Sequence, residues 1–149
     1  MNNEKLQIFV DGVINYFDTV STETATVGTP FLIKNINEYL SDFTGIIGIS
    51  GNQKGSVFFT APRPLLVHLL NDLGILSTRD DKLMDLVGEV SNTISGNARR
   101  EFGDQFLLSV PVVLKGSGDD IAIAKTIDIY VIPIVWRHLK SNLIINLES

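Results

Sequence analysis

The chain has 149 residues, which suits one folded domain, and its 44% of hydrophobic and 19% of charged residues allow a sizeable core and argue against disorder. Its formal net charge of −5, with no basic cluster longer than Arg99-Arg100, disfavours a nucleic-acid partner. The absence of cysteine excludes disulfides and cysteine-based metal or redox chemistry and fits a reducing compartment.

The N-terminal part of the chain predicts a helix followed by extended segments. Residues 3–20 place apolar side chains at helical spacing and indicate an amphipathic helix. Residues 23–35 are rich in β-branched side chains and are interpreted as extended, with Pro30 at an edge or an irregular point. Residues 37–42 are expected to form a turn or a short helical loop.

A hairpin and a second helix are expected next. Residues 44–50 and 56–60 indicate its two strands, joined by the turn-rich segment 51–55. That segment fails as a phosphate-binding loop, because its lysine precedes a glycine and a strand follows it. Residues 62–73 then predict a helix that starts with a proline and ends before Gly74.

The longest segment with a clean helical period covers residues 78–103. Thr78 or Asp80 can cap its start, and Gly103 suits its C-terminal cap. Apolar side chains fall on one side of this helix and are expected in the core: Leu83, Leu86, Val87, Val90, Ile94 and Ala98.

A polar line runs along the opposite side of the same helix. At about 100° per residue, its members fall within roughly 60° of one another: Asp85, Glu89, Asn92 and Gly96. Most polar helix faces are only solvated, but this one uses two poor helix formers. A glycine in mid-helix costs roughly 1 kcal/mol relative to alanine. One explanation for Gly96 is the close approach of another molecule's backbone.

The rest of the chain predicts strands. Residues 106–115 indicate one strand, and residues 121–125 a short second one. Residues 127–137 and 142–147 indicate a hairpin whose turn covers 138–141. The strand at 127–137 is apolar on both sides over much of its length, so we expect protein to cover both faces of the sheet there.

Strands that occur in runs, without alternating with helices, predict an α+β domain with a largely antiparallel sheet packed against long helices. Unpaired sheet edges could join two copies into a homodimer. The longest strongly apolar run, residues 129–136, is too short to span a bilayer, and the N-terminus lacks the features of a signal peptide. We therefore expect a cytoplasmic protein without a membrane segment.

The sequence offers no metal cage and no enzymatic nucleophile. His68 is interpreted as a surface or partly buried residue of its helix, and His138 has no metal-binding neighbour at a suitable spacing. No Gly-x-Ser-x-Gly element is present. Any chemistry must therefore come from the polar line and from a partner.

The pattern Asp85-x-x-x-Glu89-x-x-Asn92, followed by Gly96-Asn97-Ala98 and later by Pro111, resembles the CheC/CheX/FliY family of response-regulator phosphatases. The chain is most similar to CheX, because CheC-type chains carry two copies of Glu-x-x-Asn and this chain carries one. The resemblance implies a single CheX-like phosphatase domain over residues 1–149. It also implies a dimer formed through a continuous sheet.

The same resemblance implies a function, with a phosphorylated CheY-like receiver domain as partner. Asn92 would hold the water that attacks the aspartyl phosphate, and Glu89 would pair with a lysine of the partner. Asp85 would extend or orient that anchor, and Gly96 would let loops of the partner come close. The chain would need no cofactor of its own, since Mg²⁺ is expected in the partner.

The sequence is also compatible with two alternatives. The chain could be a non-catalytic module that binds response regulators, or a scaffold, in a chemotaxis or other two-component pathway. It could also be a structural relative of flagellar switch components, whose helix simply packs within the fold. In that case Glu89 and Asn92 would be buried or paired with other side chains.

Overall fold

Three α-helices form within residues 1–116 and 127–148, the part of the chain that the computed structural model describes. They are α1 (Asn3–Val20), α2 (Arg63–Asp72) and α3 (Asp80–Phe102). All three helices predicted from the sequence are thus confirmed. None of these described helices combines the length and the apolar character that a membrane span requires.

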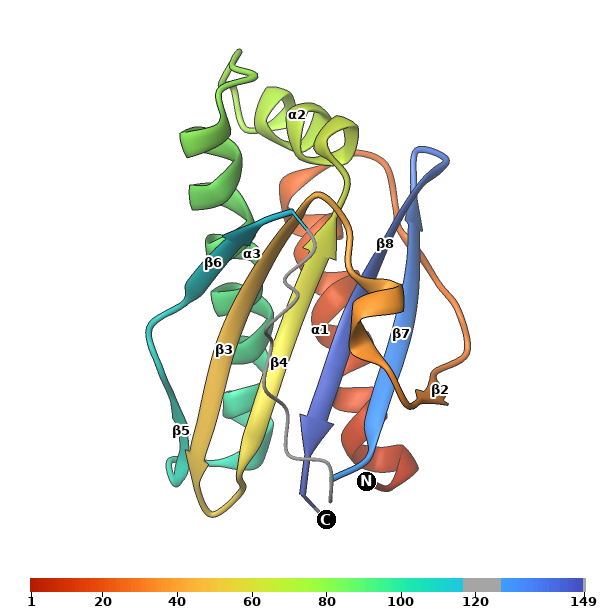
Figure 1. The fold of residues 1–149 in the computed structure, drawn as a ribbon, viewed down its shortest axis with the longest axis vertical. Coiled ribbons are helices and arrows are strands. Elements are labelled where there is room, and N and C mark those ends of the chain that lie inside the picture. The colour runs from red at the N-terminus through yellow and green to blue at the C-terminus, as the bar shows by residue number, and fades with distance from the viewer. Residues whose placement is uncertain (117–126, 149) are drawn as a thin grey trace.

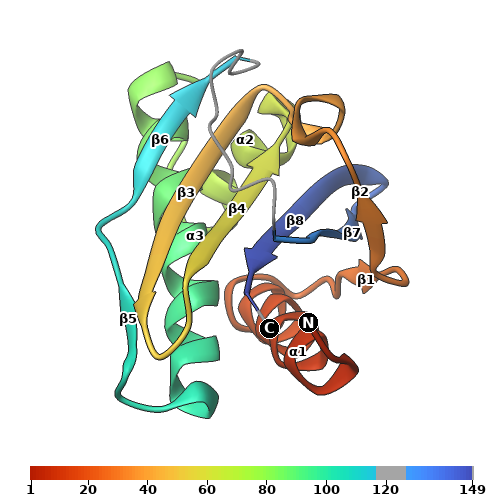
Figure 2. The same cartoon turned by 60° about the horizontal axis from the view of Figure 1, so that its bottom comes forward.

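The strands form one antiparallel sheet, as predicted, in the order β1-β7-β8-β4-β3-β5 (Figures 1 and 2). In addition, β2 pairs with β7 and β6 pairs with β3, so the short strands occupy the two edges. A 3₁₀ turn, η1 (Ile36–Tyr39), precedes the central hairpin. The strands are β1 (Thr26–Val27), β2 (Phe31–Ile33), β3 (Phe43–Gly51), β4 (Gly55–Ala61), β5 (Phe106–Leu108), β6 (Val112–Lys115), β7 (Ile129–Trp136) and β8 (Leu139–Leu147).

The sheet separates two apolar clusters. The three helices cover one face and enclose the main core, while η1 lies over the other face (Figure 2). Strand β7 contributes side chains to both clusters. Ile132 and Ile134 belong to the main core, and Ile129 and Val131 belong to the smaller cluster. The expectation that protein covers both faces of this strand is confirmed.

Helix α3 lies very close to β3 because β3 has a glycine at the crossing. A methyl group at Gly45 would overlap the carbonyl oxygen of Val87 and the hydroxyl of Ser91. The Ser91 hydroxyl is itself occupied, since it donates to the Val87 carbonyl at 2.9 Å. The sheet therefore sets the depth and the rotation of α3, and with them the direction of its outer face.

The prediction of one strand over residues 106–115 is wrong, because β5 and β6 are separate. Between them, the Ser109 amide donates to the Gly48 carbonyl at 2.9 Å, and the Ser109 hydroxyl accepts from the Gly48 amide at 2.8 Å. Pro111 follows and has no N–H to continue the ladder. The predicted short strand at 121–125 lies outside the described residues.

The turn between β7 and β8 is tighter than predicted. It contains only Arg137 and His138, with φ values of 50° and 63°. Two residues with positive φ match the two-residue hairpin turn that suits the twist of antiparallel strands. Contacts hold Arg137 in this conformation, since its guanidinium pairs with Asp72 at 2.6 Å and lies over the Trp136 ring at 4.3 Å.

Candidate functional site

The outward face of α3 carries the predicted polar line. Its predicted apolar side is buried throughout, whereas Asp85, Glu89 and Asn92 are exposed. None of these three side chains makes a hydrogen bond or an ion pair with any described residue. Asn92 follows Glu89 by about 4.5 Å along the helix axis. The alternative in which Glu89 and Asn92 are buried or paired within the fold is therefore wrong.

The start of α3 differs from the prediction. Arg79 occupies the N-cap position without a capping side-chain bond, so neither Thr78 nor Asp80 caps the helix. The Asp80 carboxylate instead accepts from Lys115 and Arg63, which come from β6 and α2. These hydrogen bonds, that from Lys115 first, lower the pKa of Asp80 below its usual range. They join three elements around the first turn of α3.

At its other end α3 stops as predicted. Gly103 has a φ of 99°, and its amide donates to the Arg99 carbonyl at 2.9 Å. The Arg99 side chain reaches past the helix end to the Phe106 carbonyl at 3.0 Å. Both ends of α3 are thus attached to neighbouring segments, which fixes the helix that carries the polar line.

Helix α1 borders the polar line on one side. It runs antiparallel to α3, because Phe9 lies 5.8 Å from Phe102 between ring centroids and Gly12 lies beside Ile94. Tyr16, one turn further along α1, interacts electrostatically with Glu89. Burial, and after it the Glu89 carboxylate, raises the pKa of this phenol well above its usual range. Sequence reasoning missed Tyr16, because its place beside Glu89 depends on how the helices cross.

The segment after β5 borders the line on the other side. A methyl group at Gly88 would lie 2.9 Å from Val113 Cγ1 and 3.5 Å from Pro111 Cβ. Gly88 thus lets this segment pack directly on α3, one turn before Asn92. The pattern had included Pro111, and the structure brings it beside the polar line. Gly88 was missed, although a glycine on a helix flank is a signal for close approach.

Gly96 differs from the glycines that permit internal packing. A methyl group there would meet no described atom within 4 Å, whereas Gly12, Gly45 and Gly88 all have close neighbours. The fold itself gives no packing reason for a glycine at this position. Gly96 leaves an open place on the face that carries Asn92.

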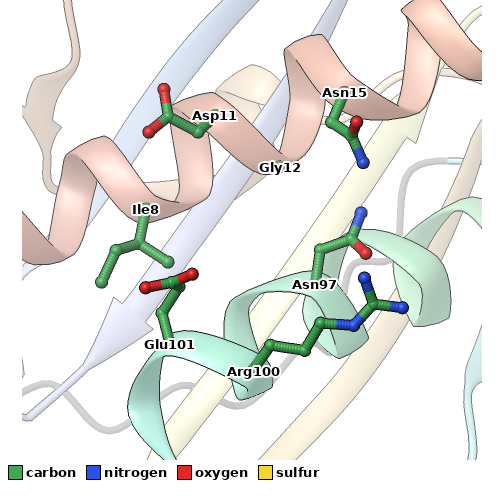
Figure 3. A pocket seen from close by; sticks show the side chains of 7 residues that line it. All are labelled: Ile8, Asp11, Gly12, Asn15, Asn97, Arg100 and Glu101. Atoms are coloured by element: carbon green, nitrogen blue, oxygen red, sulfur yellow. The ribbon is translucent and has the colours of Figure 1, made fainter.

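A groove of about 330 Å³ lies between α1 and α3, beyond Gly96 (Figure 3). Asn15 and Asn97 extend toward one another across it, and Arg100 and Glu101 line it from α3. Asp11 adds a second carboxylate, from α1. The groove is therefore polar and of mixed charge.

The polar line can orient and anchor, but it holds no group that would act alone as a catalyst. Among the described residues, no three histidine, cysteine or acidic side chains are grouped to hold a metal ion. An exposed amide can bind a water molecule, and an exposed carboxylate one turn away can bind a cation. Both suit contact with another macromolecule.

One family model matches more than half of the chain. The model of the family described as "Chemotaxis phosphatase CheX" matches residues 43–135. A CheC-like superfamily protein from Shewanella sp. PV-4 is similar in structure, with 28% identity, a TM-score of 0.87 and 100% of both chains covered. CheX from Desulfovibrio desulfuricans shares 29% identity at a TM-score of 0.83, over 97% of this chain and 99% of its own.

A more distant structure shares the fold. It is a complex of CheX with CheY, BeF₃ and Mg²⁺ from Borrelia burgdorferi, with 17% identity, a TM-score of 0.77 and 97% of both chains covered. No curated protein is significantly similar to the chain.

Proposed function

Because the chain belongs to the CheX family, we propose that it hydrolyses the aspartyl phosphate of a CheY-like receiver domain, with Glu89 and Asn92 as the two acting side chains. One observation carries the proposal. The two side chains project one helical turn apart from a fixed helix, exposed and unpaired among the described residues. Such a pair can enter a pocket of another protein without unfolding anything.

The reaction needs little from this chain. The oxygen of a water molecule attacks phosphorus, the bond from phosphorus to the aspartyl oxygen breaks, and the carboxylate leaves with the bonding electrons. The water's protons go to the phosphate product and to solvent. The Asn92 amide would hold that water in line with the breaking bond, and, being neutral, it adds no negative charge near the phosphate.

Glu89 would anchor the partner. A carboxylate one turn from Asn92 suits a charge-assisted hydrogen bond to a lysine beside the phosphate. Such a pair sets register and association rate more than overall affinity. Asp85, one turn before Glu89, would extend the acidic surface toward the same cation. We expect Mg²⁺ to be held by the receiver and not by this chain.

The test is to add the purified protein to a CheY-type receiver of the same organism, phosphorylated with acetyl phosphate, and to follow the lifetime of the phosphate. A shorter lifetime that depends on Asn92 supports the phosphatase. Binding with an unchanged lifetime would instead support the alternative, a non-catalytic module or scaffold.

The proposal extends to assembly and location. The described sheet ends in the short strands β1 and β2 on one side and β5 and β6 on the other, and we propose that a homodimer forms through such an edge. Light scattering of the purified protein would give its mass in solution. A chain that acts on receiver domains would work in the cytoplasm.

A further inference from the structure

Two neighbouring arginines at the end of α3 have different surroundings. Arg99 donates to the Phe106 carbonyl at 3.0 Å and to the Asp104 carbonyl at 3.4 Å, so it serves the turn after the helix. Arg100 makes no hydrogen bond or ion pair with a described residue, although Glu101 and Asp11 line the same groove. Its guanidinium is therefore an available cation.

Arg100 lies on the continuation of the polar line. It follows Gly96 by four residues, which places it about 6 Å further along the axis and roughly 40° around it. Gly96 leaves open space between Asn92 and the groove that Arg100 lines. A chain segment lying over Gly96 would therefore pass from Asn92 into this groove.

The lining of the groove indicates what it would bind. Asn15 and Asn97 each offer a donor and an acceptor, which suits the N–H and C=O groups of a peptide (Figure 3). Arg100 offers paired donors for a carboxylate. The carboxylates of Asp11 and Glu101 make the groove unfavourable for a highly charged free anion such as phosphate. A protein loop with one acidic side chain fits this mixture.

We propose that this groove is a second contact for the receiver domain, in which Arg100 binds a carboxylate on a loop that crosses Gly96. The inference rests on the proposed function and extends it to partner choice. Glu89 and Arg100 lie eleven residues apart, about 16 Å along α3. A matching receiver presents a lysine and an acidic side chain at that separation, and the two opposite charges fix its orientation.

The experiment compares Arg100→Glu with the wild type on the phosphorylated receiver. KM rises at least tenfold at low ionic strength while kcat stays within twofold, and the difference shrinks as salt screens the charges. Arg100→Gln only removes the charge, so it gives a smaller rise in KM. It also keeps the test valid if Arg100→Glu, which reverses the charge, fails to fold.

Lys34→Glu is the matched control, because it makes the same charge change at an exposed site between β2 and η1. An equal rise in KM for Lys34→Glu would show a general charge effect and overturn the inference. Unchanged KM in both Arg100 variants, with an active wild type, would also overturn it and leave the phosphatase proposal standing.

If the wild type did not shorten the phosphate lifetime, the phosphatase proposal would be weakened, and the second contact would be tested by measuring binding instead. The probe is then the same receiver loaded with beryllium fluoride. Weaker binding by Arg100→Glu than by Lys34→Glu supports the second contact, and equal binding overturns it.

Discussion

Tyr16 of α1 and Glu89 of α3 interact electrostatically across the contact between the two helices. The phenol is buried, and the carboxylate is exposed on the polar line. Burial, followed by the Glu89 charge, raises the pKa of Tyr16, so the phenol stays protonated wherever the protein is folded at ordinary pH. Glu89, which we propose binds the partner, thus has the neutral hydroxyl group of Tyr16 as its neighbour.

The first prediction concerns alkaline pH. A phenol whose pKa is raised in the folded state stabilises the fold fully below the unfolded pKa, about 10, and this stability is lost as pH rises toward the folded pKa. Tyr16→Phe should therefore lose less stability than the wild type between about pH 9 and pH 11. Urea unfolding at several pH values measures this. If both proteins lost stability equally steeply at alkaline pH, the pKa of Tyr16 would be the same in the folded and unfolded states, and the prediction would be wrong.

The second prediction concerns Asn92. Asn92→Ala should lower kcat by at least about tenfold, equivalent to about 1.4 kcal/mol in the barrier, if the amide positions the water. Stability should hardly change, because the side chain is exposed and unbonded among the described residues. Single-turnover decay of the phosphorylated receiver measures the effect. Thr93→Ala, the exposed neighbour, is the control, and a matching loss there would refute a specific role for the amide.

The third prediction separates anchoring from chemistry. Glu89→Ala should raise KM at least as strongly as it lowers kcat, because the pair proposed between Glu89 and a lysine would hold the partner. Glu89→Gln keeps the shape of the side chain and should show most of the same defect. Glu38→Gln, an exposed acid of η1 on the other face of the sheet, should behave as wild type. A Glu89→Gln variant with wild-type KM would argue against a charge-based anchor.

The fourth prediction uses Gly96, where stability and activity should move in opposite directions. Gly96→Ala removes a mid-helix glycine without any clash, so the melting temperature should rise by about 2–4 °C for about 1 kcal/mol. The added methyl group should weaken association with the receiver, seen as a higher KM. A stabilised variant with full activity would show that no partner backbone comes close there.

Gly45→Ala provides the contrast for that experiment. Its methyl group would overlap Val87 and Ser91, so the variant should lose roughly 1–3 kcal/mol of stability. Thermal unfolding of the two glycine variants side by side separates an internal packing role from an external one.

The face of α3 could be predicted from the sequence because its signal is local. The spacing of Leu83, Val87, Val90 and Ile94 requires only a helical period, and it places Glu89 and Asn92 outward. The N-cap prediction failed because Asp80 binds Lys115 and Arg63, which are distant in sequence. A local capping rule cannot include such competitors.

The borders of the site were not predictable for the same reason. Gly45 is close to Ser91, and Gly88 to Pro111, only after the sheet and helix have packed together. The groove between Asn15 and Asn97 likewise requires the crossing of α1 and α3. The break between β5 and β6 had a local sign in Pro111, which the apolar run around it obscured.

The glycine in β3 has a consequence for selectivity. With α3 seated directly on the sheet at Gly45, the helix cannot move inward or turn on its axis to suit different substrates. Under the proposed function, discrimination among receivers would then depend on their own dimensions: a regulator whose lysine and phosphate match the spacing of Glu89 and Asn92 would be dephosphorylated, and one that differs by a fraction of a helical turn would stay phosphorylated.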